Sequence, residues 1–357
     1  MQVHVECMSH KCSCNVAILA DDLTSAADAA APFVAQGMTA TVGRRAIPAK
    51  QTVICAVDAA SRSLSAREAS IRVERFANDL RGAPILFKTV DSTLRGHVRE
   101  EVAASLRGAD RSRIVFAPAF PDAGRTTVDG VQLVAGWPVH LSPYGHDPVH
   151  PARISYLQDL LPANATDAMV LDARTQDDLD QQVSEIDRPE TVLWVGSPGL
   201  ARALAKWLGA KGQVESPSFA GDGASLVVVG SANKVSHRQA ARLNDTASTV
   251  LVAPTDRRGD PSIVLGELID EAVSQLETGT FGSLIATGGD TMEAILESMN
   301  VQSFDLLGEI EPGFPVGSAE IAGRLVLLGM KAGGFGDDAT LERAVAQLWK
   351  QTQEQSL

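Results

Sequence analysis

The sequence predicts a two-domain α/β protein in which each domain is a mostly parallel sheet flanked by helices. The chain has 357 residues, more than one ordinary hydrophobic core accommodates. Short β-branched runs alternate with amphipathic stretches in both halves, a pattern typical of parallel sheets covered by helices. Residues 209–223 are polar and rich in Gly and Ser, and they interrupt this alternation. We therefore expect one domain over residues 15–210 and a second over residues 224–357, with the active site in the cleft between them.

The first domain is expected to contain six strands and five helices. The predicted strands are Val16–Ala20, Val53–Val57, Ile85–Lys88, Ile114–Ala117, Met169–Leu171 and Val192–Val195. The predicted helices are Leu23–Gln36, Ser65–Leu80, Val98–Leu106, Gln176–Ile186 and Gly199–Leu208. Between residues 125 and 150 the alternation gives way to Gly, Pro and β-branched residues, which predicts a hairpin or a pair of short strands at one edge of the site.

The same alternation restarts after residue 223. The predicted strands are Leu226–Val229, Val250–Ala253, Leu284–Ala286 and Leu325–Leu328. The predicted helices are Val235–Leu243, Pro261–Leu276, Thr291–Met299 and Ala339–Trp349. The second domain is therefore expected to be another α/β layer structure.

Charge and hydropathy restrict the class of protein. The net charge is −13, which argues against a nucleic-acid partner, because phosphate backbones require a basic surface. No run approaches the roughly 18 apolar residues of a membrane span, and no apolar segment of a signal peptide follows the N-terminus. These features predict a cytoplasmic protein without membrane contact.

Three of the four cysteines lie near the N-terminus. Cys7, Cys12 and Cys14 could form a zinc site with His10, but no second pair of ligands follows them. The alternative, which we favour, is a reduced segment without a metal, and the sequence assigns these cysteines no role.

Polar clusters follow four predicted strands of the first domain. Because ligands of open α/β sheets gather at the carboxyl ends of the strands, these loops are candidate site segments. One interpretation is that their Asp, Ser and Thr residues cap the following helices. The other interpretation is a binding site for an anionic polyol. In such a site, Arg and Lys side chains bind the carboxylate of the ligand, and aspartates bind its hydroxyl groups or accept a proton. The candidate residues are Asp22, Arg62, Lys88, Asp91, Ser92 and Arg95.

Three turns with glycine or serine follow strands of the second domain. They are residues 230–233, 287–291 and 331–337. Glycine lets backbone N–H groups approach an anion closely, and a helix N-terminus adds its positive end, so the turns predict a nucleotide-phosphate site. The sequence contains neither a Walker A pattern nor a G-x-G-x-x-G fingerprint after the first strand, which disfavours a dinucleotide-dependent oxidoreductase.

Six ordered motifs resemble the four-carbon acid sugar kinase family, whose members phosphorylate threonate, erythronate or 3-oxo-tetronate with ATP. The resemblance runs from about Val16 to Ala346, through LADDLTSAAD, KTVDSTLRGHVREE, APAFPDAGRTTVDG, ATGGDTMEAIL, GEIEPGFP and GMKAGGFGDDATL. It implies that the N-terminal domain binds the sugar acid and the C-terminal domain the nucleotide. The residues that it implies on the nucleotide side are Ser231, Gly288, Gly289, Asp290, Thr291 and Gly333.

The resemblance and the loop chemistry together predict an ATP- and Mg²⁺-dependent kinase acting on a hydroxyl of a four-carbon sugar acid, with the terminal 4-hydroxyl favoured. Asp22, Asp91 and Asp290 are all candidates for the proton acceptor, and we favour Asp22. Asp290 is a candidate Mg²⁺ ligand, although the sequence does not assign the metal site. A non-catalytic sugar-acid-binding protein of kinase ancestry is the alternative. The first motif commonly reads ADDLTGAND in the family, whereas this chain has Ser25, Ala26 and Ala27, and such a departure could reflect lost activity. The oligomeric state is left open, with a homodimer one alternative.

Overall fold

The computed structural model describes residues 14–147, 150–163, 165, 167–209, 219, 223–243, 248–254 and 261–349. These residues form two compact units. The first unit comprises the chain up to Asp21 together with Ala49–Leu208, and the second comprises Asp22–Pro48 together with the chain from Gly209 onward. One division falls between Leu208 and Gly209, and residues 22–48 group with the second unit although they lie in the N-terminal half of the sequence.

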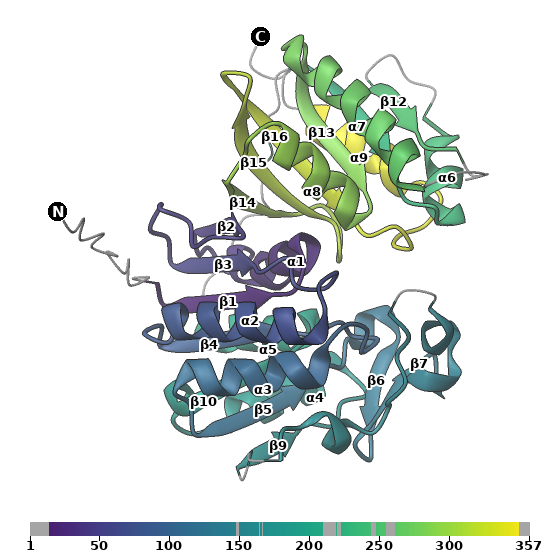
Figure 1. Ribbon diagram of the computed structural model, residues 1–357. Helices are drawn as coiled ribbons and strands as arrows, with labels where there is room; N and C mark the ends of the chain where they lie inside the picture. Colours follow the sequence, from purple (N-terminus) through teal and green to yellow (C-terminus); the bar gives the residue numbers. More distant parts are fainter. Residues whose placement is uncertain are drawn as a thin grey trace, which may run out of the picture. The chain divides into compact units, whose positions relative to one another are not determined.

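The first unit contains a six-stranded parallel sheet with the order β3-β1-β4-β10-β5-β9 (Figure 1). The strands are β1 (Val16–Ala20), β3 (Ile54–Asp58), β4 (Ile85–Thr89), β5 (Arg113–Ala117), β9 (Ala168–Val170) and β10 (Val192–Gly196). The helices are α2 (Ala66–Leu80), α3 (Val98–Ala109), α4 (Gln176–Ser184) and α5 (Pro198–Leu208). In Figure 1, α2 and α3 lie side by side in front of the sheet and α5 lies behind it.

The region between β5 and β9 forms a small antiparallel sheet, as the pattern over residues 125–150 predicted. Its strands are β6 (Arg125–Val128), β7 (Val131–Val134) and β8 (Trp137–Pro138). Short 3₁₀ turns surround it, and others lie elsewhere in the unit: Pro121–Ala123, Val139–Leu141, Pro143–His146, Leu157–Leu160 and Pro189–Thr191.

The second unit contains a mixed sheet with the order β12-β11-β13-β16-β15-β14-β2. The strands are β2 (Ala40–Arg44), β11 (Ala224–Val229), β12 (Ser248–Val252), β13 (Phe281–Thr287), β14 (Ser303–Glu309), β15 (Pro315–Ile321) and β16 (Arg324–Lys331). The four strands from β12 to β16 in this order are parallel, whereas β15, β14 and β2 are each antiparallel to the strand before them. The predicted α/β class with mostly parallel pairing is confirmed, but β2, β14 and β15 were not predicted.

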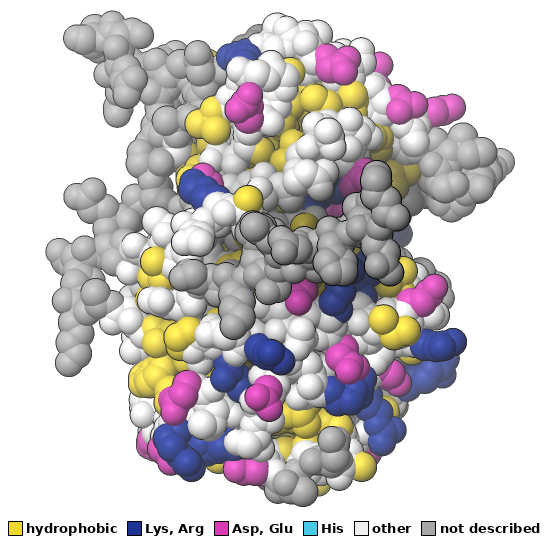
Figure 2. Space-filling view, turned by 60° about the vertical axis from the view of Figure 1, so that its left-hand side comes forward, with side chains coloured by type: hydrophobic (Ala, Val, Ile, Leu, Met, Phe, Trp, Pro, Cys, Tyr) yellow, Lys and Arg dark blue, Asp and Glu magenta, His cyan; other side chains and the backbone are white. Residues whose placement is uncertain are grey.

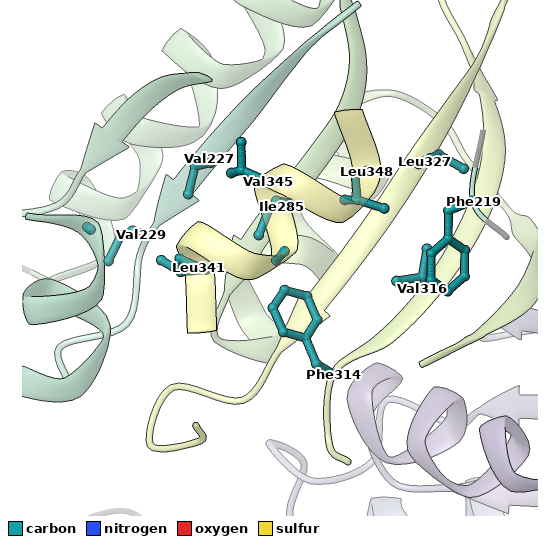
Figure 3. Close-up of a cluster of buried hydrophobic side chains, with 12 residues drawn as sticks. Phe219, Val227, Val229, Ile285, Phe314, Val316, Leu327, Leu341, Val345 and Leu348 are labelled. Atoms are coloured by element: carbon teal, nitrogen blue, oxygen red, sulfur yellow. The ribbon is translucent and has the colours of Figure 1, made fainter. Parts of the chain in front are cut away.

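Helices cover both faces of this second sheet. They are α1 (Leu23–Val34), α6 (Lys234–Ala240), α7 (Pro261–Glu277), α8 (Gly289–Ser298) and α9 (Thr340–Trp349). Figure 3 shows Leu341, Val345 and Leu348 of α9 packed over the strands, in a buried cluster that also contains Ile285 and Phe314. Helix α1 packs on β14 and β15 beside α8, and this apolar contact explains why residues 22–48 belong to the second unit.

On the face shown in Figure 2, Lys and Arg side chains are interspersed with Asp and Glu. Among the described helices, none combines the length and apolarity that a membrane crossing requires. Cys14 and Cys55 are buried thiols, whereas Cys7, Cys12 and His10 lie outside the described residues.

Candidate functional site

The predicted site residues fall into two groups, one in each unit. The first unit contains the candidates at the carboxyl ends of β3 and β4, which are Arg62, Lys88, Asp91, Ser92 and Arg95. The second unit contains Asp22, which is the first residue of the segment 22–48. It also contains the candidates that follow β11, β13 and β16, which are Ser231, Gly288, Gly289, Asp290, Thr291 and Gly333.

In the first unit, Arg62 forms a bidentate ion pair with an aspartate that the sequence analysis had not singled out. Its Nε donates to Asp21 Oδ2 at 2.7 Å and its Nη2 donates to Asp21 Oδ1 at 3.0 Å. Burial alone would favour the protonated form of Asp21, but the charges of Arg62 and Lys88 outweigh it and hold the pKa of Asp21 below its ordinary value. Asp21 is therefore a carboxylate at neutral pH, and it fixes the orientation of the Arg62 guanidinium.

Asp91 and Arg95 form a second such pair. Arg95 Nε donates to Asp91 Oδ2 at 2.5 Å, and Asp91 also accepts from the Thr93 N–H at 3.0 Å and from the Thr93 hydroxyl at 2.9 Å. Burial would raise the pKa of Asp91, but the charges of Arg95 and Arg62 lower it. Arg95 also lies 3.6 Å from Asp147 and over the ring of Tyr144. The carbonyl of Ser92 accepts a hydrogen bond from Gln132 on β7 at 2.8 Å, so the small sheet contacts this loop.

Lys88 lies in a buried polar cluster that sequence reasoning missed. Its Nζ is 2.8 Å from Glu101 Oε2, and Glu101 Oε1 accepts from the Ser61 hydroxyl at 2.7 Å. Both charged side chains are almost fully buried, with 1% and 3% of their area exposed. The pairing connects α3 with β4, and it satisfies a charge that would otherwise be costly to bury. Contact between Lys88 and a substrate stays a prediction.

Two histidines adjoin the arginine pairs and were also missed. The rings of His97 and His150 lie 6.2 Å apart in an edge-on arrangement, and the backbone N–H of His150 donates to Asp147 Oδ1 at 2.8 Å. Partial burial, followed by the charge of Arg62, lowers the pKa of His150, so this imidazole is neutral at pH 7. Neither histidine follows a predicted strand directly, so the pattern that identified the other loops could not find them.

In the second unit, the three predicted turns contact one another. The Gly288 N–H donates to the Lys331 carbonyl at 2.9 Å, and the Ser231 N–H donates to the Thr287 carbonyl at 3.1 Å. A Cβ atom at Gly230 would lie 2.1 Å from Thr291 Oγ1, and one at Gly333 would lie 2.2 Å from Ser231 Oγ. The parallel strands β11, β13 and β16 therefore end in turns that pack too closely for larger side chains.

Helix α8 begins inside this group of turns. Gly288 has a φ of 96° and precedes the first helical residue, Gly289, while Asp290 and Thr291 lie in the first turn. The first N–H groups of a helix lack intrahelical partners and carry partial positive charge, which makes this end suitable for a phosphate group. The Thr287 hydroxyl beside it is buried and makes no hydrogen bond to any residue that the structure describes.

Asp22 is the N-cap of α1. Its Oδ1 accepts from the Ser25 N–H at 2.7 Å, which is the helix-capping role that the sequence analysis had considered as the alternative to a catalytic one. Proton acceptance by this carboxylate stays a prediction.

Lys331, the last residue of β16, is a further unanticipated feature of the turns. Its side chain is buried, and its Nζ donates to the carbonyls of Ala332 at 2.9 Å, Phe335 at 3.0 Å and Gly333 at 3.3 Å. Burial lowers the pKa of Lys331 to about 8, an effect that the charge of Glu311 partly opposes. These hydrogen bonds from Lys331 stabilise the conformation of the third turn.

The donor set around the turns fits a metal that relies mainly on phosphate and water. Among the described residues, no group of three His, Cys, Asp or Glu side chains is arranged to hold a metal ion. Mg²⁺ commonly takes only one or two protein carboxylates together with phosphate oxygens and water. Asp290, an exposed residue in the first turn of α8, carries a carboxylate of this kind.

Comparison with known proteins assigns the chain to a family. A model of a sugar-binding N-terminal domain matches residues 16–167, and a model of a nucleotide-binding C-terminal domain matches residues 255–341. Two proteins named D-threonate kinase, from Cupriavidus necator and Bordetella bronchiseptica, are 31% and 32% identical to the chain over 92% of its length and 96% of theirs. The chain belongs to the four-carbon acid sugar kinase family. The expected class of enzyme, a kinase that acts on a hydroxyl group of a sugar acid, is confirmed.

The chain is also similar to a further curated kinase and to solved structures. A protein named 3-oxo-tetronate kinase from Methylobacterium radiotolerans is 26% identical over 92% of the chain and 97% of its own length. A solved structure from Salmonella typhimurium, described as a putative tRNA synthase, has the same fold, with a TM-score of 0.75 at 22% identity over 92% of the chain and 98% of its own. A domain from Bordetella bronchiseptica is described as a domain-swapped dimer with bound citrate, and it matches at 29% identity and a TM-score of 0.50 over 94% of this chain and 98% of its own.

The matched ranges of this kinase-family chain do not coincide with its compact units. Residues 22–48 lie within the range matched by the sugar-binding model but pack in the second unit. Ser231 lies before the range matched by the nucleotide-binding model, although its backbone bonds to Thr287 beside α8. In this chain, one segment within the range of the sugar-binding family model therefore packs in the unit that contains the glycine turns.

Proposed function

We propose that this protein transfers the γ-phosphate of ATP, with Mg²⁺, to the terminal 4-hydroxyl of a four-carbon sugar acid. The observation that carries the proposal is the packing of three glycine turns at the carboxyl ends of β11, β13 and β16. Backbone N–H groups at such turns and at the start of α8 are suited to phosphate oxygens. The family assignment supports a kinase, and the turns support a nucleotide as the phosphate donor.

The first unit supplies groups that suit the acid. Arg62 and Arg95 present planar guanidinium groups, each already oriented by an aspartate, and an oriented fork is well suited to a carboxylate. Asp91 is saturated with hydrogen bonds and has a lowered pKa, which supports a role in positioning rather than in proton acceptance. Citrate, which the related Bordetella structure is described as binding, is likewise a small hydroxycarboxylate.

In the proposed reaction the 4-hydroxyl oxygen of the acid attacks the γ-phosphorus, its proton passes to the Asp22 carboxylate, and the bond to the ADP oxygen breaks. Mg²⁺, when bound at Asp290 and the phosphates, would neutralise the charge on the transferring group. Lys331 keeps the third turn in the shape that receives the phosphates.

The choice among acids and the assembly state follow the relatives. D-Threonate is the first acid to be assayed, because two relatives above 30% identity over most of the chain are named D-threonate kinase. We also propose a homodimer, supported by the description of the related Bordetella domain as a dimer.

A coupled assay of ADP release tests the proposal. The purified chain is incubated with ATP and Mg²⁺ and, separately, with D-threonate, D-erythronate and 3-oxo-tetronate, and the product is examined by ³¹P NMR for phosphate on the terminal carbon. We expect acid-dependent ADP release that stops when EDTA removes the metal. Binding of an acid without ADP release would instead favour a non-catalytic sugar-acid-binding protein.

A further inference from the structure

A threonine of the N-terminal segment lies against the first residue of α8. Thr24 is the second residue of α1, and a Cβ atom at Gly289 would lie 2.9 Å from its Oγ1. The side chain is largely buried, with 9% of the residue exposed. Its hydroxyl makes no hydrogen bond to the residues that the structure describes, so a donor is left at the end of α8.

Ion pairs keep α8 fixed relative to the segment that carries Thr24. Arg44, at the end of β2, is buried and binds Glu293 at 2.8 Å and Glu297 at 2.6 Å, both on α8. Arg45 adds a contact to Glu293 at 2.9 Å. Because Arg44 is buried, loss of its partners would be costly, so these pairs tie β2 of residues 22–48 to α8 inside the second unit.

We propose that the Thr24 hydroxyl donates a hydrogen bond to a phosphate oxygen of the nucleotide held at the N-terminus of α8. This inference rests on the proposed nucleotide-binding role of the turns. A phosphate oxygen only accepts hydrogen bonds, the first N–H groups of α8 point outward from the helix end, and Thr24 is a further donor beside Gly289. The N-terminal motif would then supply both a phosphate ligand, Thr24, and the proton acceptor, Asp22, to the same unit.

The experiment measures the affinity of the full chain for ADP and for adenosine by calorimetry. Thr24→Val removes the hydroxyl while keeping the shape of the side chain, Thr24→Ser keeps the hydroxyl, and Thr24→Ala repeats the loss in case valine packs poorly. Thr278→Val is the matched control, because its hydroxyl bonds only within the C-terminal end of α7 and the adjoining turn. Thermal melting establishes that each variant is folded.

We expect Thr24→Val and Thr24→Ala to weaken ADP binding about tenfold or more, the scale for a hydrogen bond to a charged group, with adenosine affinity unchanged. Thr24→Ser should bind ADP nearly as well as the wild type, and Thr278→Val should match it. Equal loss of ADP and adenosine affinity, or ADP affinity that does not depend on the hydroxyl, would overturn the inference while leaving the proposed function in place. A wild-type chain that binds no ADP would overturn both.

Discussion

Lys331 should make nucleotide affinity depend on pH. Its pKa is about 8 in the folded protein because the ammonium group is buried, and its Nζ donates to the carbonyls of the turn that contains Gly333. Phosphate groups on that turn would favour the charged lysine and raise its pKa, so ADP binding above pH 8 should take up a proton. The affinity for ADP should therefore fall as the pH rises above 8. If the pKa in the complex returns to the ordinary lysine value of 10.5, the affinity should fall about 15-fold between pH 8 and roughly pH 9.5.

Calorimetry over this pH range measures the effect directly. Nucleotide phosphates are already fully ionised above roughly pH 8, so their own titration does not contribute. Repeating the titration in buffers of different ionisation enthalpy gives the number of protons taken up. Lys331→Met removes the charge at similar length, and this variant should bind ADP more weakly at pH 7.5 and show little further change up to pH 9.5. A wild-type affinity that is flat above pH 8, or a variant that keeps the wild-type slope, would refute the reasoning.

The free energy of unfolding should change in the opposite direction. Between pH 8 and 10.5 the unfolded chain holds the Lys331 proton more tightly than the folded chain does, so the contribution of this group to stability rises with pH. The difference of about 2.5 pKa units corresponds to about 3 kcal/mol over that interval. Comparison of denaturant unfolding of the wild type and of Lys331→Met isolates this contribution from other groups. Opposite pH trends in stability and affinity cannot both come from a general loss of structure.

Three further predictions concern the first unit and the proton acceptor. Arg95→Lys should raise KM for the acid about tenfold or more with little effect on the affinity for ADP, because an ammonium group cannot reproduce the guanidinium fork; an unchanged KM would place Arg95 outside the site. Asp22→Asn should lower kcat about 10²-fold while still capping α1, whereas Asp91→Asn should mainly raise KM. Steady-state kinetics of both variants measure this, and the opposite pattern would assign proton acceptance to Asp91 and positioning to Asp22. Glu101→Ala should destabilise the protein by roughly 3 kcal/mol or more, measured by denaturant unfolding, because Lys88 would remain buried without its partner; a Lys88→Met, Glu101→Leu double variant that is as unstable as the single one would contradict that reason.

The parallel parts of both sheets could be predicted because their strands are short apolar runs between amphipathic helices. The predicted Ile85–Lys88 and Ile114–Ala117 differ from β4 and β5 by a residue at one end. The antiparallel strands were missed for a physical reason. Strand β14 alternates buried and partly exposed residues, and β2 is a short stretch that contains a glycine and ends in a charged side chain, so neither resembles the continuous apolar run of a central parallel strand.

The candidate site could be predicted wherever a polar residue directly follows a strand. That rule found Arg62, Asp91 and the glycine turns, and the contacts among the turns agree with their proposed common role. It could not find Glu101, which comes from α3 and meets Lys88 only after the chain folds. It also gave no reason to single out Lys331, because an ammonium group at a strand end looks the same in sequence whether it is exposed or buried against carbonyls.

Because residues 22–48 pack in the second unit, the two candidate proton acceptors belong to different units. Asp22 belongs to the unit that contains the glycine turns, and Asp91 belongs to the unit that contains the arginine pairs. Asp91 already accepts three hydrogen bonds and is held ionised by Arg95, so it would be a weak base and an effective anchor. Asp22 lies two residues from Thr24, which touches the position where α8 begins. If the glycine turns bind the nucleotide as proposed, a base in the same unit would keep a fixed relation to the phosphates, and the first unit would only have to orient the hydroxyl. This division of roles gives a physical reason to favour Asp22.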